Sequence, residues 1–289
     1  MHTAHTIALP DRPPLILGQT ALVMGILNVT PDSFSDGGQH NLVAAAVDHA
    51  HQMIAEGADI IDLGGESTRP GSEPVGVQQE LDRVMPVIQA LVAAGITTPI
   101  SIDTYKPLVA DQAIQAGAAI INDVHGLQGA PEMADVAALH DVPVILMHWQ
   151  KQREPGISLF DDMAAYFERS IARALQAGIS RERIILDPGF GFGKTLAENY
   201  DLLKNLERNG QIGVQNPFIF PILVGTSRKS MIGRLLDIPA DQRLAGTIAT
   251  NVIGYLNGGH IFRVHDVRAN RDALRVAQAT LYGPPTDLE

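Results

Sequence analysis

Polar side chains suited to ligand binding recur along this chain, each where a short apolar run stops. Four cationic residues follow such runs, namely Arg69, Arg228, Lys229 and Arg263. In a chain of net charge -11 they indicate a local site for a small anion. The alternative is that they pair with surface carboxylates, as most Lys and Arg side chains do. The runs stop, in chain order, at Asn28, at Asp62 and Glu66, at Asp103, at Asn122 and Asp123, at Met147 and His148, at Asp187, at Arg228 to Ser230, and at Arg263 and His265.

The segments between these runs predict the architecture. Each of the first seven runs leads into a segment with apolar residues at three- and four-residue spacing, which is the period of a helix. Eight strands alternating with helices favour an α/β protein with a single (β/α)8 TIM barrel and a short N-terminal extension. All strand C-terminal ends of such a barrel open onto one face, so the polar residues are expected to converge there. An open doubly wound sheet is the alternative fold.

Two smaller features refine this picture. The segment LILG, residues 15–18, is expected to form an extra hairpin or a plug at the bottom of the barrel. Five of the helices are expected to end at a glycine, because glycine adopts the left-handed conformation that closes a helix. These glycines are Gly57, Gly95, Gly178, Gly210, and Gly258 or Gly259.

Length and composition restrict the class of protein. The 289 residues, without a linker-like tract, predict one domain over residues 1–289 with a core at about 15–282. The net charge of -11 and the lack of a basic stripe argue against a nucleic-acid partner. The absence of cysteine excludes disulfides and Cys-based zinc sites and fits a reducing compartment. Without a signal-like N-terminus or a membrane-length apolar run, the sequence predicts a cytoplasmic protein with no membrane partner.

Known nucleotide and zinc motifs fail in this chain. The segment GFGFGKT, residues 189–195, resembles a phosphate-binding loop, but the first glycine of that motif would fall on Pro188. The dinucleotide fingerprint GxGxxG would need a glycine where Lys194 stands. No HExxH occurs, so the sequence does not support a hydrolytic zinc site of that type.

Seven other motifs occur in an order that resembles the dihydropteroate synthase family. They are GILNVTPDSFSDGG (25–38), GADIIDLGGESTRPGS (57–72), SIDT (101–104), IND (121–123), LDPGFGFGK (186–194), SRKS (227–230) and RVHDV (263–267). The resemblance implies a transferase that condenses 6-hydroxymethyl-7,8-dihydropterin pyrophosphate with p-aminobenzoate in folate biosynthesis. It also implies Mg²⁺ as cofactor, a homodimer and binding of sulfonamides, which mimic p-aminobenzoate.

The resemblance assigns a pterin-binding set. A pterin ring presents adjacent N–H donors and a carbonyl acceptor, so its pocket needs carboxylate and amide partners at fixed positions. Asp187 is expected to accept from the donors of the ring, and Lys229 to donate to its acceptors. The alternatives are purely structural roles, an Asx turn before Pro188 for Asp187 and a strand-end cap for Asn122. The full pterin set is Asp103, Asn122, Met147, Asp187, Phe192, Lys229 and Arg263.

The resemblance also assigns residues to the leaving diphosphate and to the reaction. Arginine offers a planar fork to phosphate oxygens, and a protonated histidine adds a second charged donor. Asn28 is the expected Mg²⁺ ligand, because its side-chain oxygen suits that cation. The diphosphate set is Asn28, Arg69, Arg263 and His265, and the catalytic set is Asp36, Arg69, Lys229, Arg263 and His265.

The p-aminobenzoate side depends on two polar, Gly- and Pro-punctuated loops that have the composition of ligand-closing loops. The expected residues are Phe34, Thr68, Pro70 and Ser230. Three residues depart from the pattern common in the family, namely His125, Trp149 and Lys151. Two rival functions remain, a methyltransferase that passes methyl from methyltetrahydrofolate to a corrinoid protein, and a non-catalytic pterin-binding paralogue.

Overall fold

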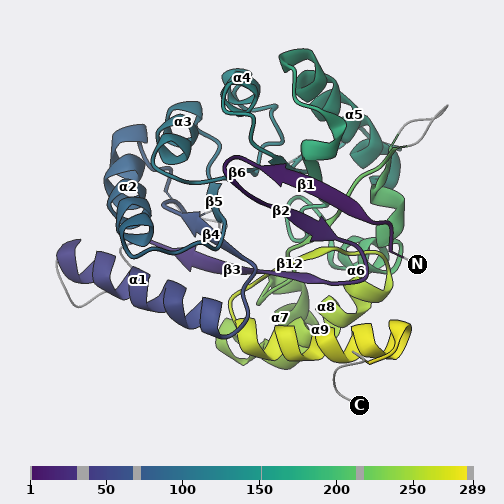
Figure 1. The fold of residues 1–289 in the computed structure, drawn as a ribbon. Coiled ribbons are helices and arrows are strands. Elements are labelled where there is room, and N and C mark those ends of the chain that lie inside the picture. Colours follow the sequence, from purple (N-terminus) through teal and green to yellow (C-terminus); the bar gives the residue numbers. More distant parts are fainter. Residues whose placement is uncertain (1, 31–38, 68–72, 151, 213–217, 285–289) are drawn as a thin grey trace.

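The computed structural model describes residues 2–30, 39–67, 73–150, 152–212 and 218–284. The eight predicted strands form one sheet of parallel neighbours, in the order β11-β12-β3-β4-β5-β6-β7-β8 (Figure 1). Their bounds are β3 Leu22–Asn28, β4 Ile60–Gly64, β5 Ile100–Asp103, β6 Ile120–Asp123, β7 Val144–Met147, β8 Ile184–Asp187, β11 Leu223–Val224 and β12 Ile261–Val264.

The two ends of this sheet meet. Leu186 of β8 forms a parallel bridge with Ile222, the residue before β11. The Leu186 amide also donates to the carbonyl of Pro221 at 2.9 Å. The sheet is therefore closed into the predicted (β/α)8 barrel, and the open doubly wound alternative is wrong.

Helices surround the barrel, as Figure 1 shows. No helix in the described ranges is long and apolar enough to span a membrane. The helices are α1 Gln39–Ala55, α2 Val77–Ala93, α3 Pro107–Gln115, α4 Glu132–Leu139, α5 Leu159–Ala177, α6 Leu196–Lys204, α7 Ser230–Leu236, α8 Leu244–Leu256 and α9 Val267–Tyr282. Short 3₁₀ turns cover Arg181–Arg183, Leu206–Asn209 and Ala240–Gln242, and the remaining strands are β1 His5–Leu9, β2 Arg12–Leu17, β9 Gln211–Ile212 and β10 Phe218–Ile219.

Successive residues of the barrel strands pack into two different cores. Ile60 and Ile145 belong to a cluster inside the barrel, whereas their neighbours Ile61 and Val144 belong to the layer between strands and helices. Side chains alternate in direction along a strand, so a strand covered on both faces needs apolar residues at consecutive positions. This requirement explains why the strands are continuous apolar runs.

The N-terminal segment closes the bottom of the barrel. Strands β1 and β2 pair antiparallel, and the hairpin lies across one end of the barrel in Figure 1. Ile7, Leu9, Leu15 and Leu17 are buried in the interior cluster together with the barrel strands. The predicted bottom plug is therefore confirmed, and the opposite end of the barrel remains for a site.

One predicted helix end is wrong. Gly57, Gly95, Gly178 and Gly258 have φ between 74° and 100°, as expected for residues that end helices. Gly210 instead has φ -78°, because α6 already stops at Asn205 and a 3₁₀ turn follows. The Asn205 side-chain amide donates to the carbonyl oxygen and the carboxylate of Asp201, both at 2.9 Å. These bonds give acceptors in the last turn of α6 a partner, so the helix ends earlier than the apolar pattern predicts.

A buried histidine beneath the barrel makes stability depend on pH. Burial lowers the pKa of His260 to about 3, and the neighbouring His5 and His2 add to that effect. The folded-state pKa lies below the unfolded value, so the stabilisation is complete above pH ~6.5 and is lost as pH falls toward the folded pKa. Relative to His260→Gln, the wild-type free energy of unfolding is expected to fall by about 2 kcal/mol between pH 7 and pH 5.

Urea unfolding of both proteins at each pH measures this difference, and the carboxylates common to both cancel. His51 is exposed on α1, so His51→Gln serves as the matched control and should show no such trend. A difference between wild type and His260→Gln that stays constant with pH would mean that His260 titrates alike in both states.

Candidate active site

Strand register brings the predicted polar residues to one level at the open end of the barrel. Asn28 pairs with Gly64, Gly64 with Asp103, and Asp103 with Asn122 across β3, β4, β5 and β6. Gly64 leaves space between its neighbours, because a Cβ there would lie 3.4 Å from Asn28 Oδ1 and 3.6 Å from Asp103 Cβ. These residues thus form a continuous row around half of the barrel mouth.

The other half of the mouth carries a second pair at the ends of β7 and β8. Met147 pairs with Asp187 in register, and both side chains are buried. The Asp187 carboxylate accepts a hydrogen bond from the Gly189 amide at 2.7 Å. The Asx turn considered for Asp187 therefore exists, but it uses Oδ1. A Cβ on Gly225 would lie 3.8 Å from Asp187 Oδ2 and 3.9 Å from Lys229 Nζ, so both groups lie beside Gly225.

Arg263 of β12 joins three strands beneath this row. Its Nε donates to Asp62 Oδ2 at 2.6 Å, and its Nη2 donates to Asp103 Oδ2 at 2.7 Å. Asn122 Nδ2 donates to both oxygens of Asp62 at 3.3 Å. Burial disfavours the cation, but the charges of Asp62 and Asp103 outweigh burial and raise the pKa of Arg263. Two carboxylates therefore fix the orientation of the guanidinium through Nε and Nη2, and its predicted contact with phosphate oxygens stays a prediction.

Lys229 lies beside Asp187 in the same site. Its ammonium donates to the carbonyl of Phe190 and lies 4.5 Å from the centroid of the Phe192 ring. Burial lowers the pKa of Lys229 to about 8, while the charge of Asp187 opposes this shift. Burial also raises the pKa of Asp187, and Lys229 opposes it. The two groups therefore favour each other's charged forms.

The end of β12 continues into the predicted anion side. His265 Nδ1 lies 3.0 Å from the hydroxyl of Ser227, and the His265 amide donates to the same hydroxyl at 3.1 Å. Arg228 instead forms two bonds with Asp266, at 3.0 and 2.6 Å. For Arg228 the surface-pairing alternative is correct, whereas Arg263 and Lys229 point into the site. Ser230 is exposed at the first residue of α7.

Two of the unusual residues belong to a row of rings along the mouth. The ring centroids of Tyr105 and His125 are 4.7 Å apart, those of His125 and Trp149 5.1 Å, and those of Trp149 and Phe192 5.3 Å. His125 and Trp149 therefore extend the aromatic surface that ends under Lys229. Lys151 lies outside the described residues.

The loop residues expected to contact p-aminobenzoate and the diphosphate lie outside the described ranges. Their assignments stay predictions. They are Phe34, Asp36, Thr68, Arg69 and Pro70.

Asp62 and Lys194 are the site residues that the sequence-based assignment missed. Asp62 appeared only as one of the strand stops, yet it is fully buried and holds both Arg263 and Asn122. A carboxylate inside an apolar run, two residues before the strand end, was the available signal. Lys194 counted only as the residue that breaks a nucleotide motif, but its ammonium lies 3.0 Å from His148 Nδ1 and contacts the loop after β8.

The oxygen donors of this site fit a Mg²⁺ ion that is held mainly by a bound diphosphate. In the described ranges, no group of three or more His, Asp or Glu residues is placed to hold a metal ion. Asn28 Oδ1 faces Gly64 at the edge of the site and is a single neutral oxygen donor. Mg²⁺ commonly takes one or two protein oxygens and completes its shell with phosphate and water, so a lone amide oxygen beside a diphosphate is compatible with it.

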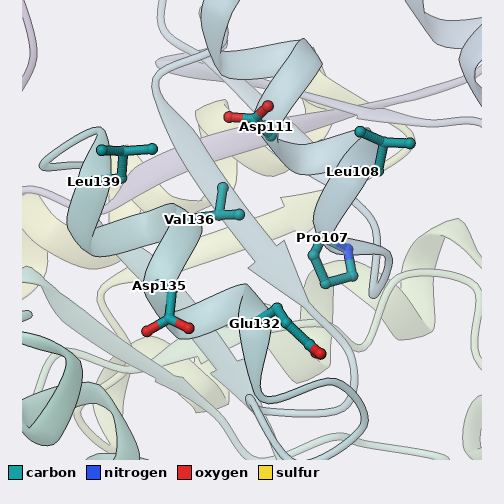
Figure 2. A pocket seen from close by; sticks show the side chains of 7 residues that line it. All are labelled: Pro107, Leu108, Asp111, Glu132, Asp135, Val136 and Leu139. Carbon is teal, nitrogen blue, oxygen red and sulfur yellow. The ribbon is translucent and has the colours of Figure 1, made fainter.

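A separate hollow of about 540 Å³ lies between α3 and α4 (Figure 2). It shares no residue with the strand-end site. Three carboxylates and exposed apolar side chains line it, and His140 Nε2 lies 2.7 Å from Asp111 at its border. The lining residues are Pro107, Leu108, Asp111, Glu132, Asp135, Val136 and Leu139.

Known proteins resemble this chain over almost its whole length. The family model described as pterin binding enzyme matches residues 24–265. A dihydropteroate synthase of Escherichia coli strain K12 is 50% identical over 265 residues, covering 90% of this chain and 91% of the relative. The structure of Xanthomonas albilineans dihydropteroate synthase with 4-aminobenzoic acid has a TM-score of 0.88 and 43% identity, covering 98% and 100% of the two chains. That of the Burkholderia cenocepacia enzyme complexed with 7,8-dihydropteroate has a TM-score of 0.85 and 36% identity, covering 96% and 98%.

Proposed function

Since this chain belongs to the dihydropteroate synthases, transferases of the pterin-binding enzyme family, we propose that it joins a dihydropterin to p-aminobenzoate. The substrates are 6-hydroxymethyl-7,8-dihydropterin pyrophosphate and p-aminobenzoate, and the products are 7,8-dihydropteroate and pyrophosphate. The observation that carries this proposal is the convergence of Asp103, Asn122 and Asp187 with two partly buried cations, Lys229 and Arg263, at one barrel mouth.

Pterin recognition follows from the donors and acceptors that face this mouth. Asp187 Oδ2 would accept from the amino and ring N–H groups, since Oδ1 is held by Gly189. Asn122 and Asp103 would bond around the rest of the heterocycle, and Lys229 would donate to its acceptors. Met147 and Phe192 supply apolar surface at neighbouring positions. A ligand without these groups would leave buried polar atoms unpaired, which makes such a pocket selective.

Diphosphate binding uses residues at the ends of β3 and β12, beside the pterin-facing Asp103. Arg263 would offer its guanidinium to phosphate oxygens, His265 would donate from its ring, and Asn28 would hold Mg²⁺. A bound Mg²⁺ would neutralise part of the diphosphate charge. The loop residues Arg69 and Asp36, predicted from the sequence, would complete this set.

The reaction itself replaces one bond at the exocyclic methylene carbon of the pterin. The C–O bond to the diphosphate breaks, its electron pair leaves with pyrophosphate, and positive charge spreads into the dihydropterin. The carboxylates of Asp103 and Asp187 face that charge and stabilise it. The p-aminobenzoate amine then forms the C–N bond and loses its extra proton to the released pyrophosphate or to water. Phe34, Thr68, Pro70 and Ser230 would position the amine, so catalysis rests on placement and charge more than on a strong base.

Pyrophosphate release tests this function directly. We expect release at a rate that saturates with p-aminobenzoate and falls to background when p-aminobenzoate or the pterin substrate is omitted, because bond cleavage without amine capture returns to substrate. A coupled phosphate assay measures the release. Binding of the pterin without turnover would instead support a non-catalytic paralogue, and methyl transfer without pyrophosphate release would support the corrinoid methyltransferase.

Three further properties complete the proposal. The chain would act as a single cytoplasmic domain, which agrees with the absence of cysteine. It would form a homodimer, and exposed apolar side chains on and near α7 and α8 offer a surface for a second copy. These side chains are Leu235, Leu236, Leu244, Ile253 and Leu256.

A further inference from the structure

The loop between β8 and α6 turns sharply beside the pterin-facing residues. Gly189, Gly191 and Gly193 have φ of 69°, 79° and 61°, a region that side chains other than glycine rarely adopt. A Cβ on Gly189 would lie 2.1 Å from the carbonyl oxygen of His148, so the backbone at this position has no room for one. The loop therefore depends on its glycines. Backbone carbonyls in such a turn also need hydrogen-bond donors, because no helix or sheet supplies them.

Lys194 provides such donors. Its ammonium donates to the carbonyls of Gly189 at 2.9 Å and Phe192 at 3.1 Å, and it lies 3.0 Å from His148 Nδ1. A lysine ammonium has three N–H donors, which match these three acceptors, and a fourth, the carbonyl of His148, lies farther away at 3.5 Å. The side chain thus ties both ends of the loop to the end of β7.

A second bond fixes the histidine in this arrangement. His148 Nε2 lies 3.1 Å from Asp162 Oδ2 on α5, and His148 is almost fully buried. With Nδ1 accepting from Lys194, Nε2 carries the hydrogen and donates to Asp162. Burial lowers the pKa of His148 to about 2, and the positive charge of Lys194 adds to this effect. The neutral imidazole therefore connects the ammonium to a carboxylate.

The two carbonyls that Lys194 holds belong to residues with direct consequences for the site. The Gly189 amide donates to Asp187 Oδ1 at 2.7 Å, so the position of Gly189 sets the orientation of that carboxylate. The Phe192 ring lies 4.5 Å from Lys229 Nζ. One ammonium therefore controls the carboxylate and the ring from the same loop.

We propose that Lys194 is a positioning residue that holds Asp187 and Phe192 in the geometry required for pterin binding. This inference rests on the proposed function and adds to it a residue that does not touch the substrate. Its effect reaches the pterin half of the site through Gly189 and Phe192, whereas Arg263 and His265 of the diphosphate half belong to β12 and the residue after it.

The chain contains its own reporter of this loop. Trp149 is the single tryptophan, and its ring lies 5.3 Å from that of Phe192 in an edge-on arrangement. A displacement of Phe192 changes the surroundings of the indole, so the emission of Trp149 should report on the loop without any ligand.

The test compares Lys194→Met with Lys204→Met in the full chain. Lys204 is exposed in the last turn of α6, which makes it a matched control. For Lys194→Met we expect calorimetric affinity for phosphate-free 6-hydroxymethyl-7,8-dihydropterin to fall about tenfold or more, the range for loss of charged hydrogen bonds. Affinity for pyrophosphate with Mg²⁺ should stay within about twofold of wild type, and Trp149 emission should shift. Lys204→Met should match wild type in all three.

Three results would overturn the proposal. They are an unchanged pterin affinity, an equal loss for the pterin and for pyrophosphate, and a selective pterin loss with unaltered Trp149 emission. If Lys194→Met does not fold, Lys194→Arg decides. Its larger guanidinium cannot place one atom between three acceptors, so pterin affinity should fall about threefold or more, while unchanged affinity would contradict the proposal. Pyrophosphate release by wild type and Lys204→Met separately establishes whether the proposed function holds.

Discussion

Replacement of Arg263 by alanine is expected to slow turnover strongly and to destabilise the fold at the same time. The guanidinium binds Asp62 at 2.6 Å and Asp103 at 2.7 Å, and Asp62 is fully buried. Removal of the cation leaves the Asp62 and Asp103 carboxylates without their counter-charge, with only the Asn122 amide still donating to Asp62. Breaking a buried pair in this way costs about 3–5 kcal/mol. Urea unfolding measures the stability loss.

The same variant tests the anion side of the site. Pyrophosphate affinity should fall more than affinity for a pterin that lacks phosphates, because in the proposed complex the guanidinium would contact phosphate oxygens directly. Loss of such a charged contact in the reacting complex is expected to lower kcat/KM by about a thousandfold. Isothermal titration with each ligand and steady-state kinetics give the two comparisons.

A matched arginine outside the site serves as the control. Arg271 on α9 pairs with Asp59 at 2.8 Å near the bottom of the barrel, and both side chains are 26% exposed. Arg271→Ala should cost little stability and leave pyrophosphate affinity unchanged, since partly exposed pairs contribute about 1 kcal/mol or less. If Arg263→Ala behaves like Arg271→Ala, the fork has no special role in the site. Equal losses for pyrophosphate and pterin would indicate general damage.

The architecture was predictable because each strand is buried on both faces. Consecutive apolar residues such as Ile60 and Ile61 serve two different cores, so the strands appear in the sequence as uninterrupted runs. The polar residue that ends each run then marks the open face of the barrel. Register alone places Asp103 beside Asn122 and Met147 beside Asp187, as the barrel interpretation predicted.

The partners of the site residues were not predictable from the same pattern. Asp62 and Arg263 are far apart in sequence, and their bond depends on the pairing of β12 with β3, which is the neighbour of β4. Arg228 and Lys229 are adjacent, yet one bonds Asp266 on the surface and the other is directed at Phe190. The positive φ of 55° at Arg228 turns the chain between them, and composition does not encode that turn.

Local hydrogen bonds explain the remaining differences. Asp123 follows an apolar run as Asp187 does, but its two oxygens accept from the amides of His125 and Leu127 at 2.8 and 2.7 Å. It therefore stabilises a turn, whereas Asp187 gives only Oδ1 to such a turn. The two strand ends look alike in sequence, and only the number of oxygens used by the backbone separates a structural carboxylate from one available to a ligand.

Replacement of Asp187 by asparagine should therefore keep the fold and weaken pterin binding. The Oδ1 atom of asparagine can still accept from Gly189, so the turn survives. Its amide nitrogen would stand where Oδ2 now lies. That nitrogen is a donor, so it could not accept from the N–H groups of the pterin or from the ammonium of Lys229. Affinity for a dihydropterin is expected to fall by about 2–4 kcal/mol, the range for losing a charged hydrogen bond and leaving buried donors unpaired.

Calorimetric titration with a phosphate-free dihydropterin measures this loss, and Asp123→Asn is the matched control. That substitution removes a buried carboxylate from the turn after β6, so it should lower stability and leave pterin affinity nearly unchanged. The affinity for the pterin should also depend on pH. Burial raises the pKa of Asp187, and only its charged form accepts with both oxygens. Wild-type affinity should therefore fall as the pH drops through that pKa, and this fall should be absent in Asp187→Asn. If Asp187→Asn binds the pterin as wild type does, Asp187 serves the turn alone and the pterin edge is read by other residues.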